Sequence, residues 1–162
     1  MRRWEDHVQE TVDHLLDAAL AHDDVEIVGE LAAPLPAMMI GLLLGFPDEM
    51  WPKLQYWSET TIALGGGPRY FDEAGTLAAM EFAGAAAELY EEKKGCPAED
   101  VMSHWISVEE STGGEVGGHP FGLDQIISDC LLLLDGGAET TRTVIARTLL
   151  ALADHPAEWE KL

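Results

Sequence analysis

Hydrophobic residues recur at helical spacing along most of the chain. The pattern predicts helices at about 2–22, 31–44, from the N-cap Asp48 to Ile62, 73–94, 98–107 and 123–154, with a further helix beginning at Ala157. Glycine and proline separate these segments, and residues 65–73 and 109–122 are expected to form a turn and a loop or hairpin. Val25–Val28 is expected to be a short extended link. The sequence therefore predicts a mainly α fold.

The longest predicted helix, about 123–154, contains the most unusual pattern of the chain. The apolar run Leu131–Leu134 leads into Gly136-Gly137, which an acid and two threonines follow. An unbroken helix of this length would extend about 48 Å at 1.5 Å per residue, which is long for a chain of 162 residues. Two glycines inside a buried helix each cost about 1 kcal/mol relative to alanine. A compensating role for the glycine pair is therefore expected.

Two interpretations of the glycine pair are open on periodicity alone. If the helix continues, the Thr140 hydroxyl can bond the Gly136 carbonyl, and the missing Cβ atoms leave room for a flat ligand or a diatomic molecule. Glu139 and Thr140 would then form an acid–alcohol pair suited to proton transfer. Alternatively, the helix ends at Asp135 and a new one begins with Glu139 in its first turn. Periodicity slightly favours this second interpretation.

Histidine and cysteine residues do not show metal-binding spacing. His7, His14 and His22 are seven and eight residues apart, so about two helical turns, or roughly 10 Å, separate neighbours. A zinc ion needs its donors at about 2 Å, which disfavours a small helical metalloprotein. Cys96 is expected at an exposed helix end, and Cys130 is expected to pack as a small apolar side chain.

Charge and composition exclude several classes of partner. Acidic residues outnumber basic ones 30 to 9, for a net charge of −21, whereas nucleic acids and anionic membranes require basic patches. The charged start MRRWEDH does not resemble a signal peptide, and the apolar stretch Leu35–Phe46 is too short for a membrane anchor. Two cysteines suit a cytoplasmic location. A non-catalytic acidic helical bundle that binds a protein partner is one function compatible with this composition.

The segment LLLLDGGAETTRTVIARTLLAL resembles the long I helix of cytochromes P450, whose pattern is Ala/Gly-Gly-x-Asp/Glu-Thr-Thr/Ser. The surrounding segments agree with that family in order. Residues 34–58 look like helix E and the start of F, 65–73 like the F–G loop, 74–94 like G, 99–106 like H, and 152–162 like the I–J junction. The resemblance covers essentially the whole chain. It implies that the helix continues through the glycines with a local distortion.

The resemblance implies a haem-dependent monooxygenase that inserts one oxygen atom from O₂ into a hydrophobic small molecule, with electrons from a ferredoxin. Gly136, Gly137, Thr140 and Thr141 would contact haem b. Thr140 would also hold a water or the bound oxygen species, and Glu139 would help deliver protons for cleavage of the O–O bond. The catalytic residues implied are therefore Glu139 and Thr140.

The resemblance also implies a substrate pocket beneath a lid at about 62–71. Its expected residues are Leu132, Asp135, Ile62 and Tyr70. The Thr-Thr-Arg variant looks most like soluble actinobacterial enzymes that hydroxylate sterol side chains or similar terpenoids. Asp135 stands where the family usually has an apolar residue, so its carboxylate should be exposed or paired, with Arg142 or Arg69 as candidate partners.

Finally, the resemblance implies that residues 1–162 are a partial helical domain, truncated at both ends, from about helix D to the start of helix J. The haem-thiolate loop, with its cysteine ligand, and the Glu-x-x-Arg helix would lie beyond Leu162. No metal ligand is therefore expected in this chain. The isolated fragment is expected to be inactive and not to bind haem normally.

Overall fold

A computed structural model describes residues 2–21 and 23–161, which are almost entirely helical. The helices are α1 (Arg2–Ala19), the π-helical turn η1 (Val28–Ala32), α2 (Pro34–Leu44), the 3-10 turn η2 (Asp48–Met50), α3 (Trp51–Thr61), the 3-10 turns η3 (Ile62–Gly66) and η4 (Pro68–Tyr70), α4 (Glu73–Gly95), α5 (Val101–Thr112), α6 (Leu123–Asp154) and α7 (Pro156–Trp159). Strands β1 (Glu115–Val116) and β2 (His119–Pro120) form an antiparallel hairpin, in which Glu115 pairs with Pro120 and Val116 with His119. The mainly α prediction is confirmed.

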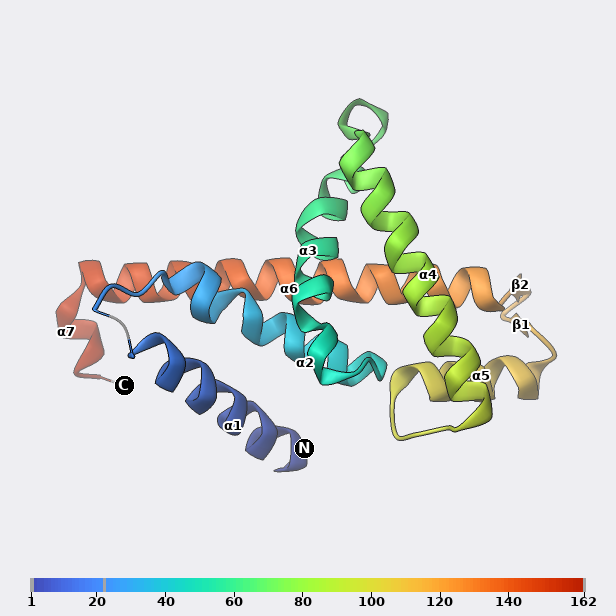
Figure 1. The fold of residues 1–162 in the computed structure, drawn as a ribbon, viewed down its shortest axis with the longest axis horizontal. Helices are drawn as coiled ribbons and strands as arrows, with labels where there is room; N and C mark the ends of the chain where they lie inside the picture. Colours follow the sequence, from blue (N-terminus) through green and yellow to red (C-terminus); the bar gives the residue numbers. More distant parts are fainter. Residues whose placement is uncertain (1, 22, 162) are drawn as a thin grey trace.

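Helix α6 is the axis of the molecule. It runs along the whole long dimension, and α2, α3 and α4 pack on it (Figure 1). The η3–η4 segment projects beyond the helices at the far end of α3, and α7 turns back from the C-terminal end of α6 (Figure 1). No helix in the described part of the chain is long and apolar enough to cross a bilayer.

One side of α6 supplies much of the hydrophobic core. Ile126, Cys130, Leu134 and Ala138 are buried, and their spacing of four places them close to one line along the helix because a turn contains 3.6 residues. Burying a leucine-sized side chain contributes about 1.5–3 kcal/mol. This row therefore fixes which side of α6 faces the other helices.

Aromatic rings complete the core between α3 and α4. Phe82 is fully buried, and its ring meets Trp57 edge-on at a centroid distance of 5.7 Å. Phe46 lies on another side of Phe82 at 6.2 Å. The indole Nε1 of Trp57 donates to Glu81 Oε2 over 3.1 Å, so the ring is held without an unsatisfied donor.

Capping residues set several of the predicted boundaries. Gly45 ends α2 at φ +95°, a left-handed conformation that favours glycine. Asp72 caps α4 by accepting from Gly75 N over 2.6 Å, and the N-cap Asp100 does the same for α5 through Ser103 N. Lys93 also pairs with Asp100 over 2.8 Å and ties the end of α4 to the start of α5.

Three predicted segments differ in the structure. Val28 was expected in an extended link but begins η1, because the Glu26 carboxylate accepts from the amides of Val28 and Gly29. Asp48 is not an N-cap of α3: it lies in η2, and the helix starts only at Trp51, with Pro52 in its first turn. Helix α5 spans 101–112 rather than 98–107, because its cap is Asp100 and Gly113 ends it.

The first helix ends slightly early, and other expectations hold. Helix α1 stops at Ala19 rather than at 22, and His22 lies outside the described residues. The expected hairpin within 109–122 is confirmed as β1–β2, although the first residues of this range still belong to α5. Helix α6 is continuous through both glycines, as the family resemblance implied and contrary to the break that periodicity slightly favoured.

The two glycines of α6 have different surroundings. A Cβ built on Gly137 would lie 2.4 Å from Cδ1 and 2.8 Å from Cγ1 of Ile40 on α2, whereas one on Gly136 would meet nothing within 4 Å. The absence of a side chain at Gly137 therefore permits close packing of α2 on α6. Gly136 lies on the open side of the helix.

These surroundings predict opposite effects of two neighbouring substitutions. Gly136→Ala is expected to raise the free energy of unfolding by up to about 1 kcal/mol, because alanine favours the helix and has space. Gly137→Ala is expected to lower it by about 1 kcal/mol or more, because overpacking against Ile40 exceeds the helix gain. Urea unfolding followed by circular dichroism measures both. Equal stabilisation by the two alanines would contradict the close packing at Gly137.

Candidate functional site on α6

The open side of α6 carries a row of residues that we call the α6 strip: Leu132, Gly136, Thr140 and Val144. Their spacing of four places them along one side of the helix, away from the buried row. Leu132 and Val144 are 71% and 63% exposed, so each end of the strip carries a large apolar side chain open to solvent. The strip is therefore an apolar surface whose centre, at Gly136, lacks a side chain.

Thr140 provides the hydroxyl of this strip. Its Oγ1 donates to the carbonyl oxygen of Gly136, as the interpretation of a continuous helix predicted. The backbone remains α-helical on both sides of this bond. Because one proton is used in that bond, the hydroxyl oxygen still has a lone pair with which to accept a hydrogen bond on the open side. Thr141 is exposed.

Glu139 does not face Thr140 but the neighbouring helix α3. Its carboxylate pairs with Arg142, whose guanidinium also binds Glu59 of α3 over 2.7 Å. Burial raises the pKa of Glu139, the positive charge of Arg142 opposes this rise, and the negative charge of Glu59 adds to it. Adjacent residues on a helix point in different directions, so transfer of a proton from Glu139 to Thr140 requires the carboxyl to turn or a water to bridge.

Asp135 is half-buried beside α3. Its Oδ1 lies 3.0 Å from Oγ1 of Thr61, which is itself 2.7 Å from the carbonyl oxygen of Trp57. Burial raises the pKa of Asp135 to about 6; the hydrogen bond from Thr61 opposes this rise, and the charge of Glu139 adds to it. Asp135 is therefore paired, as expected, but with a hydroxyl.

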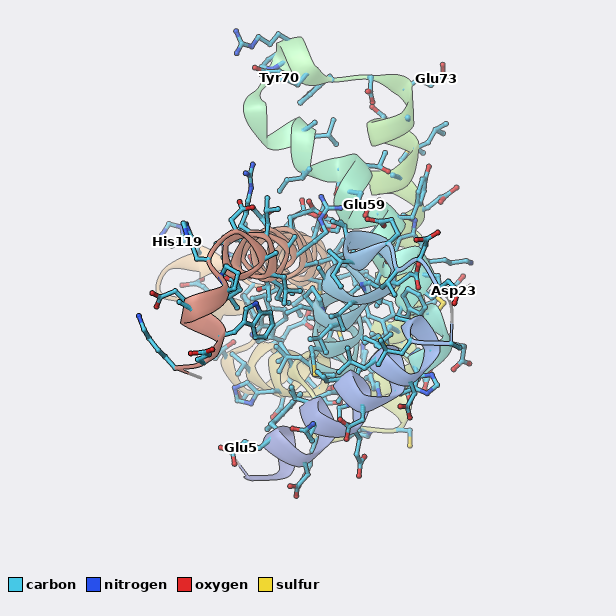
Figure 2. The ribbon with its side chains drawn as sticks, turned by 90° about the vertical axis from the view of Figure 1, so that its left-hand side faces the viewer. Glu5, Asp23, Glu59, Tyr70, Glu73 and His119 are labelled. Carbon is cyan, nitrogen blue, oxygen red and sulfur yellow. The ribbon has the colours of Figure 1, made fainter. Side chains whose placement is uncertain are left out.

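Neither of the two arginines considered as partners reaches Asp135. Arg142 is occupied by Glu139 and Glu59, and the Arg69 guanidinium lies 4.5 Å from the ring centre of Tyr70 and bonds its hydroxyl. Arg69 belongs to η4, and Figure 2 shows Tyr70 and this segment far above the end-on view of α6. Arg69 is therefore excluded as a partner of Asp135 by its position and not by its charge.

The residues expected to form a substrate pocket come from two places in the structure. Leu132 and Asp135 lie on α6, whereas Ile62 and Tyr70 lie in the projecting η3–η4 segment and are 43% and 44% exposed. Figure 2 shows Tyr70 at the tip of this projection. The assignment of these four residues to one pocket, and of Gly136, Gly137, Thr140 and Thr141 to a haem, stays a prediction.

Neither cysteine is placed as a metal thiolate near the α6 strip. Cys130 belongs to the buried row of α6, and its burial raises the pKa of the thiol to about 12, with a further rise from the charge of Asp129. Cys96 is exposed at the end of α4. A buried thiol of this kind remains protonated at neutral pH.

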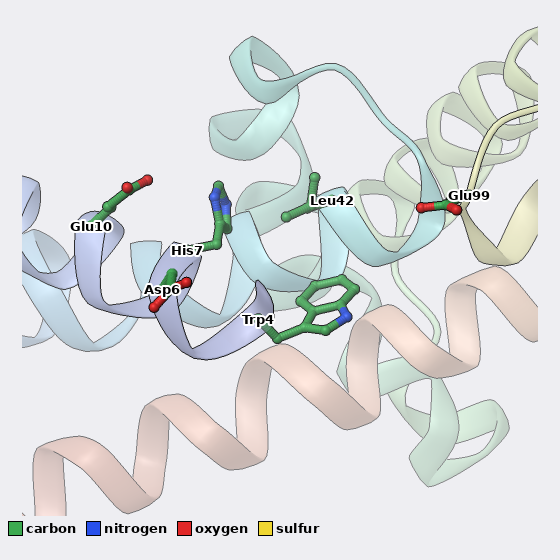
Figure 3. A pocket seen from close by; sticks show the side chains of 6 residues that line it. All are labelled: Trp4, Asp6, His7, Glu10, Leu42 and Glu99. Atoms are coloured by element: carbon green, nitrogen blue, oxygen red, sulfur yellow. The ribbon is translucent and has the colours of Figure 1, made fainter. Parts of the chain in front are cut away.

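A groove beside α1 was not predicted from the sequence. It has a volume of about 360 Å³ and lies between α1, the end of α2 and the segment before α5 (Figure 3). Its lining residues are Trp4, Asp6, His7, Glu10, Leu42 and Glu99. Glu99 is far from the others in sequence, so no local pattern indicates that these side chains meet.

The fold and the α6 strip define a mainly α protein that is built on one long central helix. This helix contains two adjacent glycines and continues through them. No family model matches the chain. Curated relatives that align with nearly the whole chain are named as cytochromes P450 or as monooxygenases. A linalool 8-monooxygenase of Pseudomonas putida is 28% identical over 98% of this chain and 38% of its own length.

Further comparisons agree. A steroid C26-monooxygenase of Rhodococcus jostii is 34% identical over 83% of this chain and 27% of its own length. The crystal structure of CYP109E1 from Bacillus megaterium in complex with testosterone matches all of this chain and 42% of its own, with 27% identity and a TM-score of 0.80. The chain belongs to the cytochrome P450 family, in whose helical domain α6 is the I helix. It spans about two fifths of the length of the first curated relatives that it matches.

The ion pairs around Arg142 lead to a prediction about stability and pH. Removing the guanidinium by Arg142→Gln leaves Glu139 beside Glu59 and raises the pKa of Glu139 further. The pKa of an unpaired Glu139 would then be higher in the folded protein than in the unfolded chain, where a glutamate has a pKa of about 4.3. The folded protein therefore loses stability as the pH rises from this value through the pKa of Glu139 in the folded state. The variant is therefore expected to be about 0.5–1 kcal/mol less stable than the wild type at pH 7, a value limited by solvent screening, and equally stable near pH 4.

Urea unfolding at the two pH values measures this difference. Arg147→Gln is the matched control, because Arg147 is an exposed arginine on the same helix. A loss of stability that is the same at pH 4 and pH 7 would show that the Arg142 side chain acts through packing and not through its charge.

Proposed function

We propose that this chain is the oxygen-activating part of a haem-dependent monooxygenase, which inserts one oxygen atom from O₂ into a hydrophobic small molecule. The observation that carries the proposal is the α6 strip, an exposed apolar surface with a hydroxyl beside a glycine. Membership of the cytochrome P450 family supports it. A ferredoxin-type protein would supply the electrons, and two free cysteines suit a cytoplasmic enzyme.

The residues of the α6 strip fit a haem. Leu132 and Val144 offer exposed apolar contacts, and the space beside Gly136 lets a flat ring approach the helix backbone. A haem with an open coordination position supplies O₂ binding and electron transfer when bound. We propose that Gly136 and Thr140 contact it directly. Gly137 packs against Ile40, so its contribution would be to hold α2 and α6 together.

Thr140 and Glu139 would have separate tasks. The Thr140 hydroxyl is fixed by the Gly136 carbonyl, so its oxygen can accept a hydrogen bond from a water on the open side and hold that water in place. Glu139 is nearly buried but linked to the surface by Arg142 and Glu59. When its carboxyl leaves Arg142, it can take a proton from solvent and pass it to the water held by Thr140.

The proposed substrate is an apolar molecule of sterol or terpenoid type. The names of the relatives, a linalool monooxygenase and a steroid monooxygenase, support this class. The complex of CYP109E1 with testosterone supports it as well. We propose that Leu132 and Asp135 contact the substrate from α6, and that Ile62 and Tyr70 cover it when the η3–η4 segment approaches.

We also propose that residues 1–162 are a partial P450 helical domain and that the thiolate ligand of the haem lies outside them. Cys130 is buried among apolar side chains with its thiol protonated, and Cys96 is at the exposed end of α4. Neither residue lies on the α6 strip. The strip would therefore be one wall of a site whose other wall belongs to a further segment.

Substitution of Thr140 tests its proposed task in the full-length enzyme. Thr140→Ala is expected to uncouple the reaction, so that O₂ and reduced cofactor are consumed with little product, because the water beside the haem is no longer held. Thr140→Ser keeps the hydroxyl and is expected to restore much of the coupling. The ratio of product formed to O₂ consumed is the measurement. Unchanged coupling in the alanine variant would remove Thr140 from proton delivery.

The isolated chain of 162 residues provides a second test. Purified and mixed with haem, it is expected to show no carbon-monoxide difference band of a thiolate-ligated haem, because neither cysteine is positioned to bind the iron. Cys96→Ser and Cys130→Ser variants identify the ligand if a band appears. A thiolate band that disappears in one of these variants would show that the chain contains its own ligand.

A further inference from the structure

Arg142 shares one positive charge between two carboxylates. Its Nη1 binds Glu59 Oε1 on α3 over 2.7 Å, and its Nη2 binds Glu139 Oε2 on its own helix. Each arm of the guanidinium therefore holds one glutamate. Since two negative charges face a single positive one, the repulsion from Glu59 offsets part of the attraction that Arg142 exerts on Glu139.

The two glutamates differ in their access to water. The side chain of Glu59 is 38% exposed, whereas that of Glu139 is 14% exposed. Water therefore stabilises the charge of Glu59, but the charge of Glu139 depends on Arg142. A change in the strength of the Arg142 contact consequently affects Glu139 more than Glu59.

Glu59 is also held on its own helix. The amide Nε2 of Gln55, one turn earlier on α3, donates to Glu59 Oε1 over 3.0 Å, and the same oxygen accepts from Arg142. Contacts from both helices therefore keep this carboxylate beside Arg142.

Glu59 and Arg142 are the charged side chains that shift the pKa of Glu139. Helix α2, which also packs on α6, has no charged side chain. Lys53, the other charged residue of α3, lies six residues before Glu59 and therefore on a different side of that helix. Three further carboxylates, on α6, α4 and η1, are bonded to other groups: Asp135 to Thr61, Glu81 to Trp57, and Glu30 to the amide of Glu26.

We propose that Glu59 is a positioning residue for proton delivery: it draws Arg142 toward α3 and so loosens the hold of this arginine on Glu139. The inference rests on the proposed function, because it takes Glu139 as the group that passes protons to the water held by Thr140. A carboxylate that Arg142 bound alone would stay ionised and ion-paired, and it would take up a proton less readily. Glu59 acts only through Arg142.

This role predicts opposite effects of removing the two charges. Glu59→Gln keeps an oxygen that can accept from Arg142 but removes the negative charge, so the pKa of Glu139 falls. Arg142→Gln removes the positive charge, so the same pKa rises. Glu139 loses its proton as the pH rises through its pKa. The highest pH at which it can pass on a proton is therefore lower in the first variant and higher in the second.

Carbon-13 NMR of the full-length protein, labelled at the side-chain carboxyl of glutamate, measures this titration. The resonance of Glu139 is the one that is missing from Glu139→Gln. Relative to the wild type, its midpoint is expected to shift to lower pH in Glu59→Gln and to higher pH in Arg142→Gln. The second readout is the ratio of product formed to O₂ consumed, which is expected to decline at a lower pH in Glu59→Gln than in the wild type.

A matched control is Glu49→Gln, because Glu49 is an exposed glutamate just before α3, ten residues or about 15 Å from Glu59. It is expected to behave as the wild type in both measurements. An unchanged midpoint in Glu59→Gln would show that Glu59 only anchors α3, and it would overturn the inference while the monooxygenase proposal stands.

The two readouts also separate the other outcomes. A shifted midpoint with an unchanged coupling profile in Glu59→Gln would overturn the role of Glu59 in proton delivery, again with the monooxygenase proposal standing. Failure of the wild type to form any product would overturn the monooxygenase proposal, and the NMR midpoint would still decide whether Glu59 controls the protonation of Glu139.

Discussion

The side chain of Ile40 occupies the space that a side chain at Gly137 would need, and the close packing of α2 on α6 depends on this contact. With α2 seated closely, Leu134 and Ala138 are covered on one side while α3 covers Asp135 and Glu139 on another. The circumference of α6 is thereby divided into a packed part and an open part. Apolar packing occupies the first, and the strip from Leu132 to Val144 occupies the second.

The side chains between these two parts are acidic, and their protonation depends on which cation each can reach. The chain has 30 acidic and 9 basic residues, so most carboxylates have no basic partner available. Arg142 serves two glutamates at once, whereas Asp135 is left with a hydroxyl. Two carboxyl groups one turn apart on α6 therefore have different environments: Glu139 is ion-paired, whereas Asp135 accepts a hydrogen bond from a hydroxyl and has a pKa that burial raises to about 6.

Much of the fold could be predicted from local signals. The limits of α6, the end of α2 at Gly45 and the start of α4 after Asp72 follow from apolar periodicity and from residues that cap helices. The error at Val28 arose because the Glu26 carboxylate binds the first amides of η1, and the error at Asp48 because a 3-10 turn precedes α3. Periodicity did not decide whether α6 continues through Gly136 and Gly137, since the apolar pattern on the two sides of the glycines fits either one helix or two.

The site was less accessible to sequence reasoning. Thr140 and Gly136 are four residues apart, so their bond could be anticipated, and the Glu139–Arg142 pair has a readable helical spacing. Thr61 and Glu59 are 74 and 83 residues from their partners on α6, and nothing local links them. The different orientations of Gly136 and Gly137 likewise become visible only when α2 is placed.

The burial of Cys130 has a practical consequence for spectroscopy. Of the two cysteines, only Cys96 is open to solvent, at the junction of α4 and α5. A thiol-reactive fluorophore or spin label would attach there selectively without any cysteine having to be removed first. Paired with a second label introduced into the η3–η4 segment at the opposite end of α4, it would report as a molecular ruler on movement of the projecting tip relative to the helical body.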